Sequence, residues 1–274
     1  MTLVRPTNQP HARAPAPPSA AAAPGTSMLR LDRVSRHFGT LKAVDDVSFA
    51  MAAGELRAVI GPNGAGKTTF FNLISGLLPP TRGEVWFEGE NITRKSVVDR
   101  VGRGIVRTFQ ITEILPDLSV IENIRIGVEI AAGLSARPWI PRARRREIDR
   151  QVDELMAIVD LGGKGHRVVG ELAHGDQRVV EVAMALARKP RLLLLDEPTA
   201  GMGDSETDHM VALIRRLHSS QGVSILFIEH DMDIVFGIAQ RVTVLDQGRV
   251  LADGPPDAIA ADPKVRVAYL GTVA

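Results

Sequence analysis

The chain has 274 residues, of which 45% are hydrophobic and 24% charged, with a formal net charge of +1 and no cysteine. This size and composition suit one large α/β domain, or one such domain with a small insertion. The near-neutral charge gives no overall field that would attract nucleic acid or a membrane surface, and the lack of cysteine excludes disulfides and thiolate chemistry. No apolar run approaches the ~20 residues that cross a bilayer, so work at a membrane would require a docking partner.

Residues 1–27 differ from the rest of the chain, since they hold six Pro and seven Ala and no acidic residue. Such a stretch buries too little apolar surface to offset its chain entropy. The Ala20–Ala23 run is shorter than the apolar core of a signal peptide, which needs about 7–15 residues. We therefore expect a disordered tail, with patterned sequence, and a candidate true start, at Met28.

The first part of the chain is mainly strand-like in pattern. Short apolar or alternating runs predict strands at Leu29–Val34, Val44–Phe49, Leu56–Ile60, Glu84–Phe87 and Ile105–Phe109. A helical pattern from Thr68 to Leu78 interrupts this series.

Residues 111–171 are mostly helical in pattern. Apolar residues recur at helical spacing from Ile148 to Val159, and Gly162-Gly163 form a stop signal. A second helix is expected from about Gln177 to Arg188. Beyond it, helix Ser205–His218 lies among predicted strands at Leu192–Leu195, Val223–Ile228, Arg241–Leu245 and Arg249–Ala252.

A phosphate cradle is predicted directly after the strand Leu56–Ile60. The spacing matches G-x-x-x-x-G-K-[ST], in which glycines and a helix N-terminus aim backbone N–H groups at phosphate oxygens. Lys67 supplies a charge for the outer phosphates and Thr68 a hydroxyl for Mg²⁺. A Gly-rich turn that merely contains a lysine is the alternative, and the flanking strand and helix disfavour it. The predicted ATP-binding residues are Gly61, Pro62, Asn63, Gly64, Ala65, Gly66, Lys67, Thr68 and Thr69.

Two further predicted strands end in residues that suit nucleotide chemistry. Asp196 follows Leu192–Leu195 and is predicted to hold the Mg²⁺ shell, and Glu197 beside it to act as general base toward water. His230 follows another apolar strand and is expected to donate to a γ-phosphate oxygen. The alternatives are a strand that ends in two solvated acids and a histidine on a surface loop.

The segment Leu172-Ala173-His174-Gly175-Asp176-Gln177, taken with Asp196-Glu197-Pro198-Thr199 and His230, resembles the ATP-binding subunit of ABC transporters. The segment is similar to that family's L-S-G-G-Q signature, which we expect as a loop before a helix. The resemblance implies that Ala173, Gly175 and Asp176 cap ATP bound by an opposite subunit.

The resemblance covers nearly everything from Met28 onward and implies two more site residues. Gln110 matches the glutamine that contacts the metal shell, takes part in catalysis and links nucleotide to the transmembrane partner. Phe38 matches the aromatic residue that stacks on adenine, with a core aromatic as its alternative. The implied fold is an α/β P-loop ATPase with an antiparallel β subdomain and a helical insertion. The expected core is 28–110 and 190–255, the insertion 111–189 and a C-terminal tail 256–274.

Finer features are similar to the branched-chain amino acid importer subgroup, and importers of urea and short amides look alike. They include Arg107-Thr108-Phe109-Gln110, Glu229-His230-Asp231-Met232 and Ala268-Tyr269-Leu270-Gly271. The implied cofactors are ATP and Mg²⁺. The implied partners are two permease subunits, a second ATPase and, indirectly, a periplasmic binding protein, at the cytoplasmic face of the inner membrane, with no nucleic acid.

Two positions depart from the family pattern. Ala173 replaces a serine whose hydroxyl contacts the γ-phosphate, and Gly203 stands at the usual D-loop aspartate, with Asp204 one residue later. Either change could weaken one of two sites, which favours a pair of unlike ATPases. A run of five arginines from Arg137 to Arg146 is interpreted as a solvated loop rather than a lipid or nucleic-acid contact.

Two other functions remain as alternatives at this point. A soluble ABC-type ATPase acting on ribosomes or DNA is disfavoured, because such relatives join two domains or carry a long coiled coil. A regulatory subunit with little hydrolysis is suggested by Ala173 and Gly203. The transported substrate is not readable from this chain.

Overall fold

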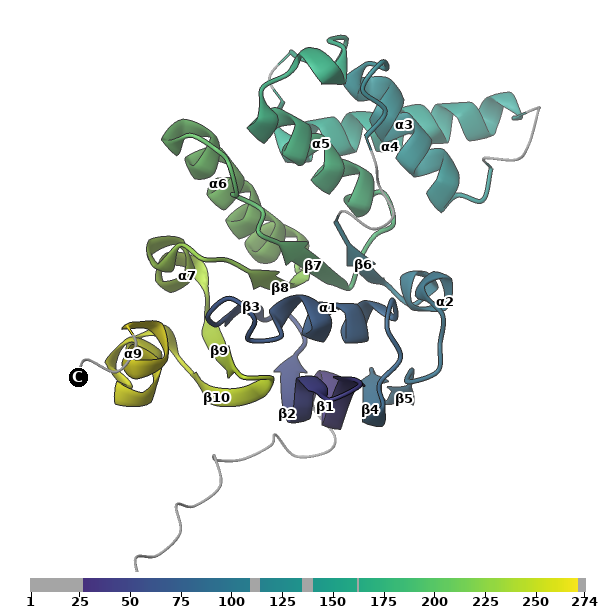
Figure 1. Ribbon diagram of the computed structural model, residues 1–274. Coiled ribbons are helices and arrows are strands. Elements are labelled where there is room, and N and C mark those ends of the chain that lie inside the picture. The colour runs from purple at the N-terminus through teal and green to yellow at the C-terminus, as the bar shows by residue number, and fades with distance from the viewer. Residues whose placement is uncertain (1–26, 109–113, 135–139, 162, 271–274) are drawn as a thin grey trace, which may run out of the picture.

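The computed structural model describes residues 27–108, 114–134, 140–161 and 163–270, which form two sheets and their covering helices (Figure 1). An antiparallel sheet of order β2-β1-β4-β5 consists of β1 (Ser27–Phe38), β2 (Leu41–Ala52), β4 (Arg82–Phe87) and β5 (Glu90–Asn91). A second sheet of order β10-β9-β3-β8-β7-β6 consists of β3 (Leu56–Ile60), β6 (Ile105–Arg107), β7 (Leu192–Asp196), β8 (Ser224–Ile228), β9 (Arg241–Asp246) and β10 (Arg249–Gly254).

Strands β9, β3, β8, β7 and β6 run parallel to one another, and β10 joins as an antiparallel edge. The helices are α1 (Lys67–Ser75), α2 (Val97–Gly102), α3 (Val120–Ala131), α4 (Arg142–Val159), α5 (His174–Leu186), α6 (Asp204–Gln221), α7 (Met232–Ile238), α8 (Pro256–Ala261) and α9 (Pro263–Leu270), with a 3₁₀ turn at Val169–Glu171. Among the described helices none is long and apolar enough to cross a membrane.

The six-stranded sheet is buried on both faces, as a parallel sheet requires. In β7, Leu193 and Leu195 face one apolar cluster, which includes residues of α3 to α6, and Leu192 and Leu194 face a second, shared with α1 and the antiparallel sheet. All four leucines are fully buried, which stabilises the fold by roughly 1.5–3 kcal/mol for each side chain.

Every predicted strand is present, although the model does not describe Phe109 at the predicted end of β6. Helix α1 ends at Ser75, three residues before the predicted end, because Gly76 adopts φ +84°, the left-handed conformation that terminates a helix. Likewise α4 ends at Val159, since Asp160 already takes φ +53° before the expected glycine stop. The buried face of α4 contains Ile148 and Val152, as predicted.

The predictions for the two ends of the chain need correction, and the predicted domain boundaries stay untested. Ser27, the last residue of the predicted tail, is the first residue of β1, and residues 1–26 are outside the described part. The predicted C-terminal tail contains α8 and α9, because Ile259 and Val265 are buried against the core. The domain boundaries stay predictions, with α3, α4 and α5 inserted between β6 and β7 (Figure 1).

Arg100 of α2 is a buried cation that ties the end of the P-loop helix to the antiparallel sheet region. Its side chain is 1% exposed, and burial lowers its pKa to about 10. The guanidinium donates to the carbonyl oxygens of Leu73 and Ile74 in the last turn of α1 at 2.6 and 2.7 Å. Further donated bonds reach the carbonyls of Ile92, Thr93 and Lys95. Arg100 therefore supplies donors to carbonyl oxygens in the last turn of α1, in addition to the local cap at Gly76.

Replacing Arg100 by methionine is expected to destabilise the protein by about 3–5 kcal/mol, because buried carbonyl groups lose their donors. Arg103→Met, which breaks a solvent-screened pair with Glu90, should leave the unfolding midpoint nearly unchanged. Urea unfolding of both variants checks this. Equal midpoints for the two variants would show that Arg100 contributes no more than a surface ion pair.

Candidate nucleotide site

The structure brings the predicted strand-end motifs to one edge of the six-stranded sheet. The phosphate loop follows β3, and the neighbouring strands β8, β7 and β6 lead to His230, Glu197 and the segment before Gln110 respectively. Carboxyl ends of adjacent parallel strands are where open α/β sheets bind ligands.

Close backbone packing explains two of the loop glycines. A Cβ on Gly61 would lie 2.2 Å from the carbonyl oxygen of Leu245, and a Cβ on Gly66 would lie 2.2 Å from that of Ala43. Gly66 also has φ +100°, which side-chain-bearing residues rarely adopt. The loop is thus wedged between β2 and β9, with helix α1 beginning at Lys67.

Lys67 lies over the loop with its ammonium in contact with backbone oxygens. Its Nζ donates to the carbonyl oxygens of Gly61 at 2.7 Å and Pro62 at 3.2 Å, and the residue is 7% exposed. Burial lowers the pKa of the Lys67 ammonium, while the charges of Glu197 and Asp196 oppose that shift. The predicted phosphate-binding cation and the two predicted acids therefore share one site.

Asp196 makes a contact that sequence reasoning missed. One of its carboxylate oxygens accepts a hydrogen bond from Arg107, which is 6% exposed and also donates to Asn72 Oδ1 at 2.6 Å. Arg107 thereby connects β6, the P-loop helix and the predicted metal-binding acid. The only sequence signal was its place in the motif Arg107-Thr108-Phe109-Gln110.

The residues present suit Mg²⁺. Asp196 keeps 20% of its side chain exposed and Thr68 is exposed, so a carboxylate and a hydroxyl, both hard oxygen donors, are accessible at this edge. Within the described ranges no cluster of three His, Cys, Asp or Glu could hold a metal by itself. Such a sparse donor set is typical of Mg²⁺ bound together with substrate phosphates.

Glu197 and His230 meet, as expected from their strands. His230 Nε2 lies 2.7 Å from Glu197 Oε1, and the two side chains remain 46% and 42% exposed. Glu197 has φ +48°, and its N–H donates to the carbonyl oxygen of Ile228 in β8. This turn holds an accessible carboxylate beside an imidazole, which suits activation of a water molecule.

A second unpredicted residue, Glu229, supports this pair. Glu229 is 4% exposed and accepts hydrogen bonds from Thr199 N at 2.9 Å, Thr199 Oγ1 at 2.6 Å and His230 N at 3.1 Å. The buried carboxylate thus fastens the loop after β8 to the loop after β7. Its only sequence signal was its place in the motif Glu229-His230-Asp231-Met232, which indicated no role for it.

Phe38 lies at the end of β1 with 44% of its surface exposed, and the guanidinium of Arg36 lies 4.6 Å from the ring centroid. The β1–β2 hairpin is linked to the phosphate loop, because Asp45 N donates to Gly248 O and Gly248 N donates to Ala65 O. The exposed ring is free to stack on a flat ligand. Its role toward adenine stays a prediction.

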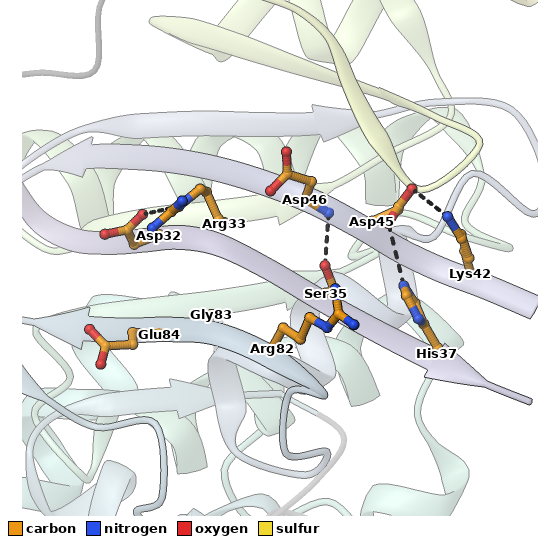
Figure 2. Close-up of a pocket in the computed structure, with 10 residues that line it drawn as sticks. All are labelled: Asp32, Arg33, Ser35, His37, Lys42, Asp45, Asp46, Arg82, Gly83 and Glu84. Carbon is orange, nitrogen blue, oxygen red and sulfur yellow. Dashed lines mark hydrogen bonds and ion pairs between the residues drawn. The ribbon is translucent and has the colours of Figure 1, made fainter.

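A pocket of about 640 Å³ on the antiparallel sheet is not part of this site (Figure 2). Asp45 lies within 3.4 Å of His37 and Lys42 and bonds Arg249 at 2.6 Å, and the bond from Arg249 is the main reason that the pKa of Asp45 is lowered. Asp32 pairs with Arg33. The acidic and basic side chains that line the pocket pair with one another, so the pocket does not indicate an anionic or a cationic ligand.

The signature residues are in helix α5 rather than in a loop before it, which corrects our expectation. Ala173 is the N-cap, and His174, Gly175 and Asp176 form the first turn. The helix begins early because Gly175 N donates to Glu206 Oε1 at 2.9 Å and Asp176 pairs with Lys164 at 2.7 Å. Ala173 supplies no side-chain cap.

Helix α5, which begins with the signature turn, and helix α1, which follows the phosphate loop, pack on different faces of the six-stranded sheet. Residues of α5 pack in the apolar cluster of α3 and α4, whereas residues of α1 pack in the other cluster (Figure 1).

Gln110, Arg137 and Trp139 lie outside the described residues, while Arg142 and Arg144 to Arg146 are exposed.

The C-terminal helix reaches the phosphate loop. Burial raises the pKa of the Tyr269 hydroxyl to about 12, and a hydrogen bond with the backbone of Gly61 opposes that rise. Tyr269 belongs to the subgroup motif Ala268-Tyr269-Leu270-Gly271, from which no role for its side chain was predicted. Tyr269 still has 37% of its surface exposed, so its burial is partial.

Comparison with known proteins agrees with this geometry. The model of the ABC transporter family matches residues 44–200, more than half of the chain. A solved ATP-binding cassette of an ABC transporter in its ADP conformation has a TM-score of 0.78 and 33% identity, with 89% of this chain and 99% of that chain covered. The chain belongs to the ABC transporter family, and it is an ATP-binding cassette ATPase with the predicted α/β fold.

The more particular resemblance is to branched-chain amino acid systems. The model of the branched-chain amino acid ATP-binding cassette transporter matches residues 249–274. The high-affinity branched-chain amino acid transport ATP-binding protein BraF of Pseudomonas aeruginosa is 37% identical over 89% of this chain and 98% of its own length. LivG of Escherichia coli K12, with the same description, is 36% identical with the same coverage.

Proposed function

We propose that this protein is the ATP-hydrolysing subunit of an importer for branched-chain or other hydrophobic amino acids. The observation that carries the hydrolytic part is the Glu197–His230 pair at 2.7 Å, beside the Lys67 loop. The relatives whose names state branched-chain amino acid transport, and the C-terminal match at residues 249–274, support the cargo class over urea or short amides.

Each site residue has a proposed task. Backbone N–H groups of residues 61–69 and the Lys67 ammonium bind the phosphates, and Phe38 stacks on adenine. Thr68, Asp196 and Gln110 would hold Mg²⁺, which supplies charge stabilisation on the phosphates. Glu197 takes a proton from the attacking water, while His230 donates to the γ-phosphate.

The site needs a second ATPase subunit to be complete. The packing of α5 and α1 on different faces of the sheet supports a site in which the signature turn faces the phosphate loop of another subunit. Ala173, Gly175 and Asp176 would cap ATP held by the partner ATPase, which Ala173 and Gly203 favour as an unlike chain. Gln110 would transmit closure to two permease subunits at the cytoplasmic face of the membrane.

Affinity purification of the tagged protein from detergent-solubilised host membranes, followed by mass spectrometry, tests this function. We expect two permeases and a second ATPase to copurify, and a binding protein encoded with them whose ligand identifies the cargo. Ribosomal or DNA-repair proteins without a permease would overturn transport and leave only the ATPase chemistry.

A further inference from the structure

One carboxylate connects the signature turn, which the proposed function directs at the partner subunit, with the D-loop. Glu206 of α6 accepts from Gly175 N of the signature turn at 2.9 Å and from Gly203 N of the D-loop at 3.1 Å. These N–H groups bind different oxygens of the same carboxylate. The D-loop and the signature belong to segments of the chain separated by strand β7.

The two bonds have different origins. The bond from Gly203 is half of a capping box, since Gly203 is the N-cap of α6 and Glu206 its third residue. A glycine has no side chain to return the bond, so only the carboxylate arm exists. The bond from Gly175 has no part in capping α6, because it comes from another helix. Capping of α6 therefore explains the bond from Gly203 N to Glu206. It does not explain the bond from Gly175 N.

Steric contacts show that the signature turn is shaped around this link. A Cβ on Gly175 would lie 2.7 Å from Glu206 Cβ, so no larger residue fits, although the backbone of Gly175 is not in the left-handed region. A Cβ on Gly201 would lie 3.7 Å from the ring of His174, so the turn before Gly203 passes close to the signature turn. The N–H groups of Gly203 and Gly175, in that order, hold the pKa of Glu206 below its usual value, and His174 and Lys164 add to this.

We infer that Glu206 is a positioning residue that makes the signature turn and the D-loop move as one unit when the partner ATPase closes on ATP. The inference rests on the proposed two-subunit site. A bidentate anion is required, because each of its two oxygens receives an N–H from a different segment.

Glu206→Gln separates the link from the helix cap. Glutamine at the third position of a helix still accepts from the N-cap N–H. Its NH₂ group cannot accept the second N–H, so the bond from Gly175 is lost. Glu122→Gln is the matched control, since Glu122 is also the third residue of a helix, accepts from Ser119 N at 2.8 Å and accepts no bond from another helix in the described structure.

Amide hydrogen exchange of the full chain without nucleotide tests the link itself. We expect Glu206→Gln to accelerate exchange at Gly175 about tenfold, the effect of losing one hydrogen bond to a charged group, while exchange at Gly203 stays as in the wild type. Unchanged exchange at Gly175 would overturn the inference. Acceleration at both glycines would also overturn it, since the effect would then be local unfolding of α6.

ATP-driven association tests the consequence, in a Glu197→Gln background that retains ATP. Light scattering should show that Glu206→Gln raises the ATP concentration for half-maximal association about tenfold, with ADP binding to the single subunit unchanged, whereas Glu122→Gln has no effect. Association that matches the Glu122→Gln control would overturn the coupling. If the Glu197→Gln parent itself does not associate, with itself or with its copurified ATPase, the two-subunit proposal fails and the exchange data alone decide the role of Glu206.

Discussion

Replacement of Lys67 by alanine is expected to abolish nucleotide binding. The ammonium is the only cation that the described structure places over the P-loop carbonyls, at 2.7 Å from Gly61 O, and it would meet the outer phosphates. Charge-assisted bonds contribute about 1.5–3 kcal/mol each, so loss of two of them lowers ATP affinity by at least about 100-fold. Isothermal titration with ATP and Mg²⁺ measures this.

Lys42→Ala is the control for that experiment. Lys42 also lies near the loop, on β2, but its ammonium is exposed and pairs with Asp45. Its removal should leave ATP affinity nearly unchanged. A Lys67→Ala protein that remains folded by circular dichroism and binds ATP as the wild type does would contradict the assignment of the loop.

Glu197→Gln is expected to bind ATP and fail to hydrolyse it. The amide keeps the shape of the carboxylate and can still bond His230, whose Nε2 lies 2.7 Å from Glu197 Oε1, but it cannot accept a proton from water. Removal of a general base costs about 10²–10⁴-fold in rate. Phosphate release at saturating ATP, together with ATP affinity, separates turnover from binding.

Glu154→Gln serves as the control, because Glu154 is an exposed acid of α4 that pairs only with Arg150 in the described structure. Its turnover should equal that of the wild type. Full turnover by the Glu197→Gln protein itself, measured without an unlike partner ATPase, would exclude Glu197 as the base. Equal turnover of complexes with and without this change would instead favour a regulatory subunit with little hydrolysis of its own.

Local pattern was sufficient for the strands and for the motifs at their ends. Leu192–Leu195 is apolar throughout because both faces of β7 are covered, and such a run cannot be solvated in any fold. The phosphate loop is equally local, since its glycines, lysine and helix start follow one another in the chain. Glu197 and His230 were each predicted to follow a strand, and the parallel sheet brings these strand ends to one edge.

The sequence pattern did not predict where some helices begin or end, or which buried residues bond to distant segments. The helix of the signature begins at His174 because Glu206, about 30 residues away, accepts the N–H of Gly175. Arg100 is charged and would be read as a surface residue, but backbone carbonyls from two other segments solvate its guanidinium. Buried charges of this kind depend on partners distant in sequence, which a local window does not contain.

The sequence by itself determined the longer strands, the phosphate loop and the acids and histidine at the strand ends, because those features depend on residues adjacent in the chain. Only the tertiary structure decided which side chains join these parts. Arg107 contacts Asp196, Glu229 fastens Thr199 to His230, and Glu206 connects Gly175 with Gly203. Each link satisfies a polar group buried or shielded by folding, so its partner is chosen by the packing of the sheet and helices and not by spacing along the chain.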